Sequence, residues 1–157
     1  MNLFEQNNVK AHAVKGLCGL KLYGCIYVEN PIFLLMGNIK KAYDDGLFLI
    51  ADISSQAIVQ AAISCSKTTR TVLDMCSGKG NKTLMFQSLA YKQFQRQLDI
   101  TTIDNKFDKT NILKKRLKTF GTSTYVSLTS DATNYNTMLE ALKVHYKDFN
   151  PSFHLVF

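Results

Sequence analysis

The hydrophobic pattern of the second half of the chain alternates between short apolar runs and segments with helical spacing. Runs rich in β-branched and apolar residues predict strands at residues 71–76, 98–104, 124–131 and 152–157. Apolar residues at helical spacing predict helices between them, at residues 82–93, 106–119 and 135–147. Strands alternating with helices are typical of a parallel sheet with right-handed crossovers. The pattern therefore predicts an α/β fold with a mostly parallel sheet.

The first half of the chain is less regular. Residues 19–31 and 46–52 have the apolar character of strands. Residues 52–65 predict a helix whose first turn is capped by Asp52 or Ser54, because both side chains can accept a hydrogen bond from a backbone N–H. The change in pattern indicates a short N-terminal appendage before the α/β domain.

Composition adds limits to this picture. The chain has 157 residues, of which 46% are hydrophobic and 20% charged, as in an ordinary globular protein. That length allows one domain and a small appendage, which we place at residues 44–157 and 1–43. No apolar run is long enough for a membrane span and the start does not resemble a secretory signal, so we expect a cytoplasmic protein without a membrane partner.

The four cysteines, at positions 18, 25, 65 and 76, form no C-x-x-C pair, and the chain has three histidines. Such a set predicts free thiols in a reducing compartment and no zinc site. The formal net charge of +7 suits a polyanionic partner, and an ordinary basic surface would give the same value.

The stretch "DMCSGKGNKT", residues 74–83, is the strongest candidate for a binding turn. A P-loop requires Gly, four residues and then Gly-Lys-Thr. Lys82 and Thr83 fit that motif, but Cys76 and Asn81 stand where its two glycines belong. The spacing therefore disfavours a P-loop.

The same turn fits a nucleoside pocket of the Rossmann-like kind. Gly78 and Gly80 would let the backbone approach a ligand, and Asp104 follows Gly80 by 24 residues at the end of the next predicted strand. An acid at that place binds ribose hydroxyls. Asp74 and Asp131 would add negative charge, which suits the cationic S-adenosylmethionine better than a pyrophosphate. Glycine turns and strand-end acids are also common in α/β proteins that bind nothing there.

These stretches resemble the Sun/Nol/Nop class of RNA cytosine-5 methyltransferases. The family has a "G-x-F-x-x-Q-D-x-S-S-Q" stretch before its cofactor motif, and "GLFLIADISSQ" matches it except at Ala51. Its cofactor motif runs Asp-x-Cys-Ala-Ala-Pro-Gly-Gly-Lys-Thr. The chain matches it at Asp74, Cys76, Gly80, Lys82 and Thr83 and departs from it at Ser77, Gly78, Lys79 and Asn81.

The resemblance implies a Rossmann-like methyltransferase domain that uses S-adenosylmethionine to methylate C5 of cytosine in ribosomal or transfer RNA. It implies that Asp104 binds the ribose and that Asp131 faces the adenine. The remaining cofactor-binding residues would be those of the turn, namely Cys76, Ser77, Gly78, Lys79, Gly80, Asn81 and Lys82. Residues 1–43 resemble, weakly, the tail of the small RNA-binding region that often precedes the domain.

The family methylates through a cysteine that adds to C6 of the base. Its two active-site cysteines follow the fourth strand, and none of the four cysteines here has that position. We therefore expect the domain to be truncated after its fourth strand, without catalytic residues and inactive by itself. The alternatives are a non-catalytic nucleotide- or RNA-binding module and a fragment of a nicotinamide-dependent oxidoreductase, which the acids at the turn disfavour.

Two surface features complete the expectations. The basic residues of 106–119 predict either a solvated helix face or a strip that faces RNA.

In a parallel sheet of the predicted kind the fourth strand pairs with the first, which would leave residues 152–157 as an apolar edge. We therefore expect self-association through that strand, since open edges recruit other chains.

Overall fold

The computed structural model describes residues 2–65, 67–146 and 152–157. The chain divides into two compact units, Met1–Ala61 and Ala62–Phe157. This division lies 18 residues beyond the expected start of the α/β domain at residue 44, and it falls within a helix. The boundary at 44 follows the change in sequence pattern and stays a prediction. No helix in the described residues has the length and apolar character needed to cross a membrane.

The first unit is built on an antiparallel hairpin of β1 (Ala11–Leu17) and β2 (Leu20–Val28). Cys18 and Gly19 connect the strands with φ angles of 48° and 80°, the left-handed pair that tight hairpin turns require. The hairpin is accompanied by α1 (Asn2–Gln6), the 3₁₀ helix η1 (Pro31–Leu35) and α2 (Gly37–Asp44). The predicted strand within 19–31 is confirmed, whereas its partner β1 was not predicted.

The strand predicted at residues 46–52 is wrong, since this described stretch forms neither strand nor helix. Its apolar residues are anchored by side-chain packing instead. The ring of Phe48 packs against Phe4 and Tyr43 at centroid distances of 5.7 and 5.9 Å. An apolar run without a neighbouring strand to pair with stays irregular, because its backbone groups need hydrogen-bond partners.

The helix predicted from residue 52 is α3 (Ile53–Ser64), and its cap is Asp52. The Asp52 carboxylate accepts hydrogen bonds from the Ser55 N–H at 2.7 Å and from the Ser54 and Ser55 hydroxyls at 2.5 and 2.7 Å. These donors hold the pKa of Asp52 well below its usual range. The cap therefore explains why the helix begins at this place in the Asp-Ile-Ser-Ser sequence.

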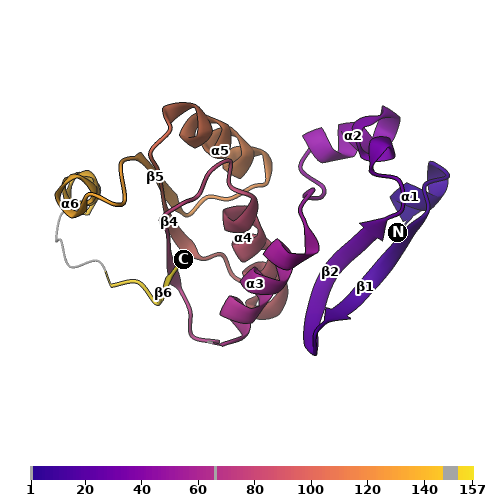
Figure 1. Ribbon diagram of the computed structural model, residues 1–157, viewed down its shortest axis with the longest axis horizontal. Helices are drawn as coiled ribbons and strands as arrows, with labels where there is room; N and C mark the ends of the chain where they lie inside the picture. The colour runs from indigo at the N-terminus through magenta and orange to yellow at the C-terminus, as the bar shows by residue number, and fades with distance from the viewer. Residues whose placement is uncertain (1, 66, 147–151) are drawn as a thin grey trace. The chain divides into compact units, whose positions relative to one another are not determined.

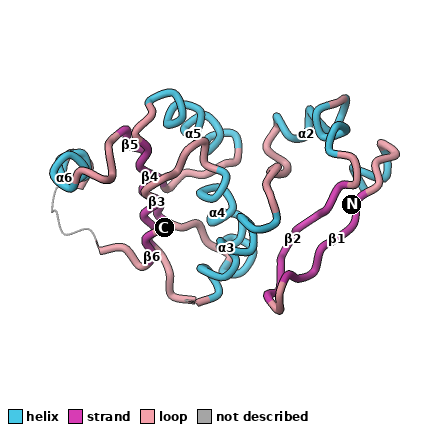
Figure 2. The backbone as a smooth tube through the Cα atoms, in the orientation of Figure 1, coloured by secondary structure: helices cyan, strands magenta, loops and turns pink. Residues whose placement is uncertain are grey.

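The second unit confirms the α/β prediction. Its four parallel strands are β3 (Thr71–Asp74), β4 (Asp99–Asp104), β5 (Tyr125–Thr129) and β6 (Leu155–Val156). They alternate with α4 (Asn81–Phe94), α5 (Phe107–Thr119) and α6 (Tyr135–Lys143) (Figure 2). The predicted helix at 135–147 is shorter than expected, and its last residue lies outside the described residues.

The strand order is β5-β4-β3-β6, so the chain moves outward from β3 to β5 and then returns to the other side of β3. The predicted pairing of the fourth strand with the first is confirmed, with Val72 opposite Leu155 and Leu73 opposite Val156. This order is compatible with a Rossmann-like fold, in which ligands bind where the strand order reverses. In this sheet that place is the carboxyl end of β3.

The sheet is covered on both faces, with α6 on one side and α4 and α5 on the other (Figure 1). On the α6 face, Leu73, Ile103 and Leu128 form a core cluster with Leu142. The buried side chains of Val72 and Ile100 lie on the other face. Asp74 comes two residues after Val72 and Asp104 four residues after Ile100, so both acids lie on that face as well, because side chains alternate along a strand. Both carboxylates therefore lie at the end of the sheet under the α4–α5 layer.

Candidate functional site

The β3–α4 turn, residues 75–80, is held in place by Gly80. This residue has φ 86° and directly precedes α4. A Cβ at position 80 would lie 2.1 Å from Cδ1 of Leu113, a fully buried side chain of α5. The space that a side chain at position 80 would need is therefore filled by α5, and the expected role of Gly80 in ligand binding stays a prediction.

Gly78 is different. It also has a left-handed φ, 55°, but a Cβ there would meet no atom within 4 Å. Its backbone N–H donates to Oδ2 of Asp104 at 2.9 Å. Gly78 is thus the glycine of the turn whose backbone borders open space, as a close approach by a ligand requires.

Asp104 connects the turn to the carboxyl end of β4. Its Oδ2 accepts from Gly78, and its Oδ1 accepts from the Lys106 N–H at 2.9 Å. Beside it, the N–H and the hydroxyl of Ser77 both donate to the Ile103 carbonyl, at 3.1 and 3.2 Å. A carboxylate offers about four acceptor positions, so these two bonds leave capacity for further donors. Asp104 therefore orients the turn and can also accept from ligand hydroxyls.

The buried carboxylate of Asp74 holds the start of the turn through hydrogen bonds. Asp74 is 2% exposed, and its Oδ2 accepts from the Thr83 hydroxyl at 2.7 Å while its Oδ1 accepts from the Cys76 N–H at 3.3 Å. Burial raises the pKa of this carboxyl, and the bond from Thr83 opposes the rise. The position matches the sequence prediction at the end of β3, but the role of Asp74 is to join β3 to α4.

Asp131 lies after β5 and belongs to a separate turn. Its side chain is exposed and accepts from the N–H and hydroxyl of Thr133, at 2.9 and 2.6 Å. These bonds lower its pKa. The structure therefore does not bring Asp131 to the pocket beside the glycine turn.

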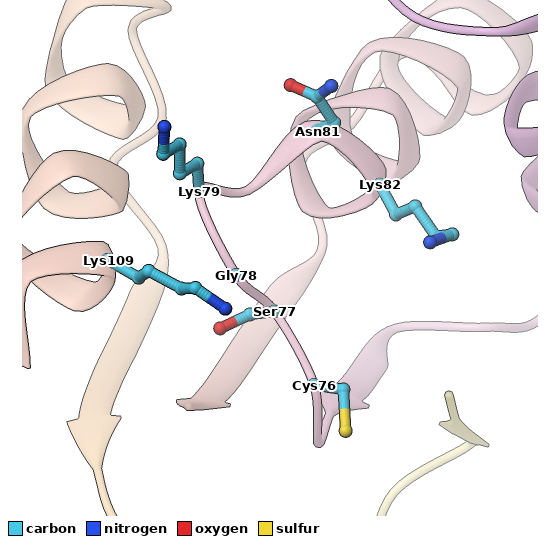
Figure 3. A pocket seen from close by; sticks show the side chains of 7 residues that line it. All are labelled: Cys76, Ser77, Gly78, Lys79, Asn81, Lys82 and Lys109. Carbon is cyan, nitrogen blue, oxygen red and sulfur yellow. The ribbon is translucent and has the colours of Figure 1, made fainter. Parts of the chain in front are cut away.

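A pocket of about 360 Å³ lies at the turn, and most of its lining was predicted from the sequence. Six of the nine predicted site residues line it, whereas Gly80, Asp104 and Asp131 do not. The lining residues are Cys76, Ser77, Gly78, Lys79, Asn81, Lys82 and Lys109. Figure 3 shows Lys109 reaching from α5 toward Ser77 and Gly78, while Lys79 projects from the turn and Lys82 from the start of α4 in other directions.

Lys109 was not predicted as a site residue. A signal was present, because Lys109 comes five residues after Asp104 and directly precedes Thr110, which is buried. The first turn of a helix after a strand lies at the ligand-binding end of a parallel sheet. The negative charge that we expected around the pocket is absent from its lining. Apart from Cys76, the ionisable side chains of the lining are the cations Lys79, Lys82 and Lys109.

Arg116 fixes the outer side of the turn. Its Nη1 donates to the Lys79 carbonyl and to Oδ1 of Asn81, both at 2.7 Å. Arg116 lies seven residues after Lys109, which places both on one flank of α5. This flank therefore contributes a clamp on the turn and a cation in the pocket.

All four cysteines are free, and Cys76 is exposed at the pocket. Burial raises the pKa of the Cys25 thiol. Residues 2–65, 67–146 and 152–157 contain no group of three or more His, Cys, Asp or Glu side chains that could hold a metal ion.

A scan against models of protein families gave no match, and neither did a search of curated proteins. The fold and site therefore define a class only: an α/β unit with a parallel sheet and a lysine-lined pocket at its strand-order reversal.

Proposed function

We propose that residues 44–157 form the cofactor-binding part of an S-adenosylmethionine-dependent RNA (cytosine-5) methyltransferase. The observation that carries the proposal is the Asp104 carboxylate, which holds the Gly78 N–H at the carboxyl ends of β3 and β4. Rossmann-like sites use an acid at this place for ribose hydroxyls. The motif resemblance of residues 46–56 and 74–83 supplies the particular cofactor and the RNA base.

The residues of the turn fit such a cofactor. Open space beside Gly78 leaves room for the ligand next to the backbone. Asp104 would accept from the ribose, and the lysines of the pocket would neutralise the carboxylate of the methionine part. When bound, S-adenosylmethionine would supply an electrophilic methyl group on its sulfonium.

The hydrogen bonds of the turn disfavour a phosphate cradle. A P-loop offers consecutive free backbone N–H groups to phosphate oxygens. In this turn the N–H groups of Cys76, Ser77 and Gly78 donate to Asp74, Ile103 and Asp104. A phosphate would have to compete with two carboxylates for these donors.

A second candidate is a non-catalytic nucleotide- or RNA-binding module. The lysines at the pocket favour it, because Lys79, Lys82 and Lys109 can all bind an anion. Nothing in this candidate requires a sulfonium or a catalytic cysteine. The two candidates therefore differ in which small ligand binds best.

Calorimetric titration of the whole chain with S-adenosylmethionine, ATP and NAD⁺ distinguishes them. We expect S-adenosylmethionine to bind most tightly of the three. Tighter binding of ATP would favour the nucleotide-binding module, and tighter binding of NAD⁺ would favour the oxidoreductase class. Either result, or no binding of S-adenosylmethionine, would contradict the proposal.

A further inference from the structure

Positive charge is distributed unequally between the two units. Residues 1–61 contain five Lys or Arg and five Asp or Glu residues, whereas residues 62–157 contain fourteen and seven. The whole net charge of +7 therefore belongs to the second unit. Residues 106–118 hold six of its basic residues and a single acid, Asp108.

The cations of α5 fall into two groups around its axis. Thr110, Leu113 and Leu117 are buried against the sheet. On one flank, Lys109 and Arg116 serve the pocket and the turn. The other group is exposed, and no ion pair within the described residues involves it: Lys114, Lys115 and Lys118.

An exposed aromatic ring shares a face of α5 with two of these lysines, and Lys115 lies about 80° from the ring around the axis. Phe107 is 66% exposed at the start of α5. At 3.6 residues per turn, Phe107, Lys114 and Lys118 lie within about 40° of one another around the axis and span about 16 Å along it. Three exposed cations without an ion pair favour an anionic partner, and the exposed ring beside them offers a surface on which a planar group can stack.

We propose that Phe107, Lys114, Lys115 and Lys118 form a binding surface for single-stranded RNA, here called the α5 strip. The inference rests on the proposed function and adds to it the place where the RNA backbone is bound. Lysines bind successive phosphates, while an aromatic ring stacks on an unpaired base. The strip begins at the end of α5 that also carries Lys109, which lies about 160° from Phe107 around the helix axis.

Other anionic partners fit the strip less well. A membrane-surface helix inserts an apolar face into lipid, but the apolar face of α5 is already buried against the sheet. An acidic protein segment would pair with the lysines but has no base to stack on Phe107. The combination of phosphate-binding cations and a stacking ring is characteristic of single-stranded nucleic acid binding.

The first test compares two triple variants by fluorescence anisotropy with a short labelled single-stranded RNA over a range of KCl concentrations. Lys114→Gln, Lys115→Gln and Lys118→Gln remove the strip. Lys67→Gln, Arg70→Gln and Lys92→Gln remove the same charge from exposed positions elsewhere in the unit.

We expect the strip variant to bind at least about tenfold more weakly and its log–log salt slope to fall by about 2, since each phosphate contact contributes about 0.7. The control variant should keep the wild-type slope. Equal loss in both variants would mean that only net charge matters and would overturn the strip, as would an unchanged strip variant or a wild type that binds no RNA.

Phe107→Leu provides a second, charge-neutral test. It should weaken RNA binding by about tenfold without a change in salt slope, because stacking is lost and the phosphates stay bound. Affinity for polyglutamate should be unchanged. Binding of polyglutamate as tightly as RNA, with equal sensitivity to the lysine changes, would identify an acidic protein as the partner and contradict the proposal.

The same variants separate the strip from the proposed function. All should bind S-adenosylmethionine like the wild type in calorimetry, because none of the substituted residues lines the pocket. Loss of RNA binding with normal cofactor binding supports the strip. Normal RNA binding by a chain that binds no S-adenosylmethionine would contradict the proposed function and leave the strip intact.

Discussion

At the scale of single residues, the two glycines of the β3–α4 turn have different roles. Both have left-handed φ angles, but Gly80 touches Leu113 whereas Gly78 borders open space. The sequence predicts a glycine turn correctly and cannot distinguish these roles, because the neighbour of Gly80 comes from a helix 33 residues further along.

Alanine at the two positions should therefore have unequal effects on stability. Gly78→Ala adds a left-handed alanine and should cost about 1–2 kcal/mol. Gly80→Ala adds overpacking of about 1–3 kcal/mol to the same strain, because its Cβ would lie 2.1 Å from Leu113. Urea denaturation of both variants measures the difference. Equal destabilisation would contradict the assigned role of Gly80.

The sequence predicts those residues of the site that are close together along the chain better than those that come from distant elements. Six lining residues are neighbours in the sequence, so one motif predicts them together: Cys76, Ser77, Gly78, Lys79, Asn81 and Lys82. Asp104 was placed by strand periodicity, and its bond to Gly78 agrees with that placement. The roles of Lys109 and Arg116 depend on how α5 is oriented about its own axis, and the charge pattern of the sequence does not reveal that orientation.

At the scale of elements, the second unit was predictable because its strands and helices alternate with clear periods. The first unit was harder. In the described residues β1 pairs with β2 alone, and its half-buried residues recur at every third position instead of every second. The apolar residues at 46–52 pack without forming a strand. Short apolar runs do not reveal whether a partner strand is present.

The edge strand β6 leads to a prediction about self-association. It pairs with β3 and lies at the end of the sheet in the described strand order. Val156 on this strand is 52% exposed. We expect light scattering of the 157-residue chain to show concentration-dependent association, because an open apolar edge can pair with another chain.

Val156→Lys should suppress this association, since a lysine on an edge strand opposes pairing. Val144→Lys is the matched control, because Val144 is 79% exposed and follows α6 rather than belonging to the sheet. A monodisperse wild type at high concentration, or equal effects of both variants, would contradict the role of β6.

At the scale of the whole molecule, the proposed cofactor site lies apart from the position at which the family has its catalytic cysteine. Methylation at C5 of cytosine in the family we compare requires a cysteine adduct. Cys76 is the cysteine at the pocket, and its N–H is used to hold the turn through Asp74. The family places its nucleophile after the fourth strand rather than in this turn.

We therefore expect the 157-residue chain to transfer no tritiated methyl group from S-adenosylmethionine to cellular RNA. The measurement is radioactivity in 5-methylcytosine after nucleoside digestion. Label that depends on the chain would contradict this expectation. Loss of that label in Cys76→Ala would then identify Cys76 as the nucleophile.

The central claim is that the β3–α4 turn and Asp104 bind S-adenosylmethionine, and calorimetry of two aspartate variants tests it most directly. Asp104→Ala removes the acceptor beside Gly78, whereas Asp99→Ala changes an exposed acid at the opposite end of the same strand. We predict that Asp104→Ala costs about 1.5–3 kcal/mol of binding free energy, the range for hydrogen bonds to a charged group, and that Asp99→Ala binds like the wild type. Wild-type affinity in Asp104→Ala, with the fold intact by circular dichroism, would contradict the claim.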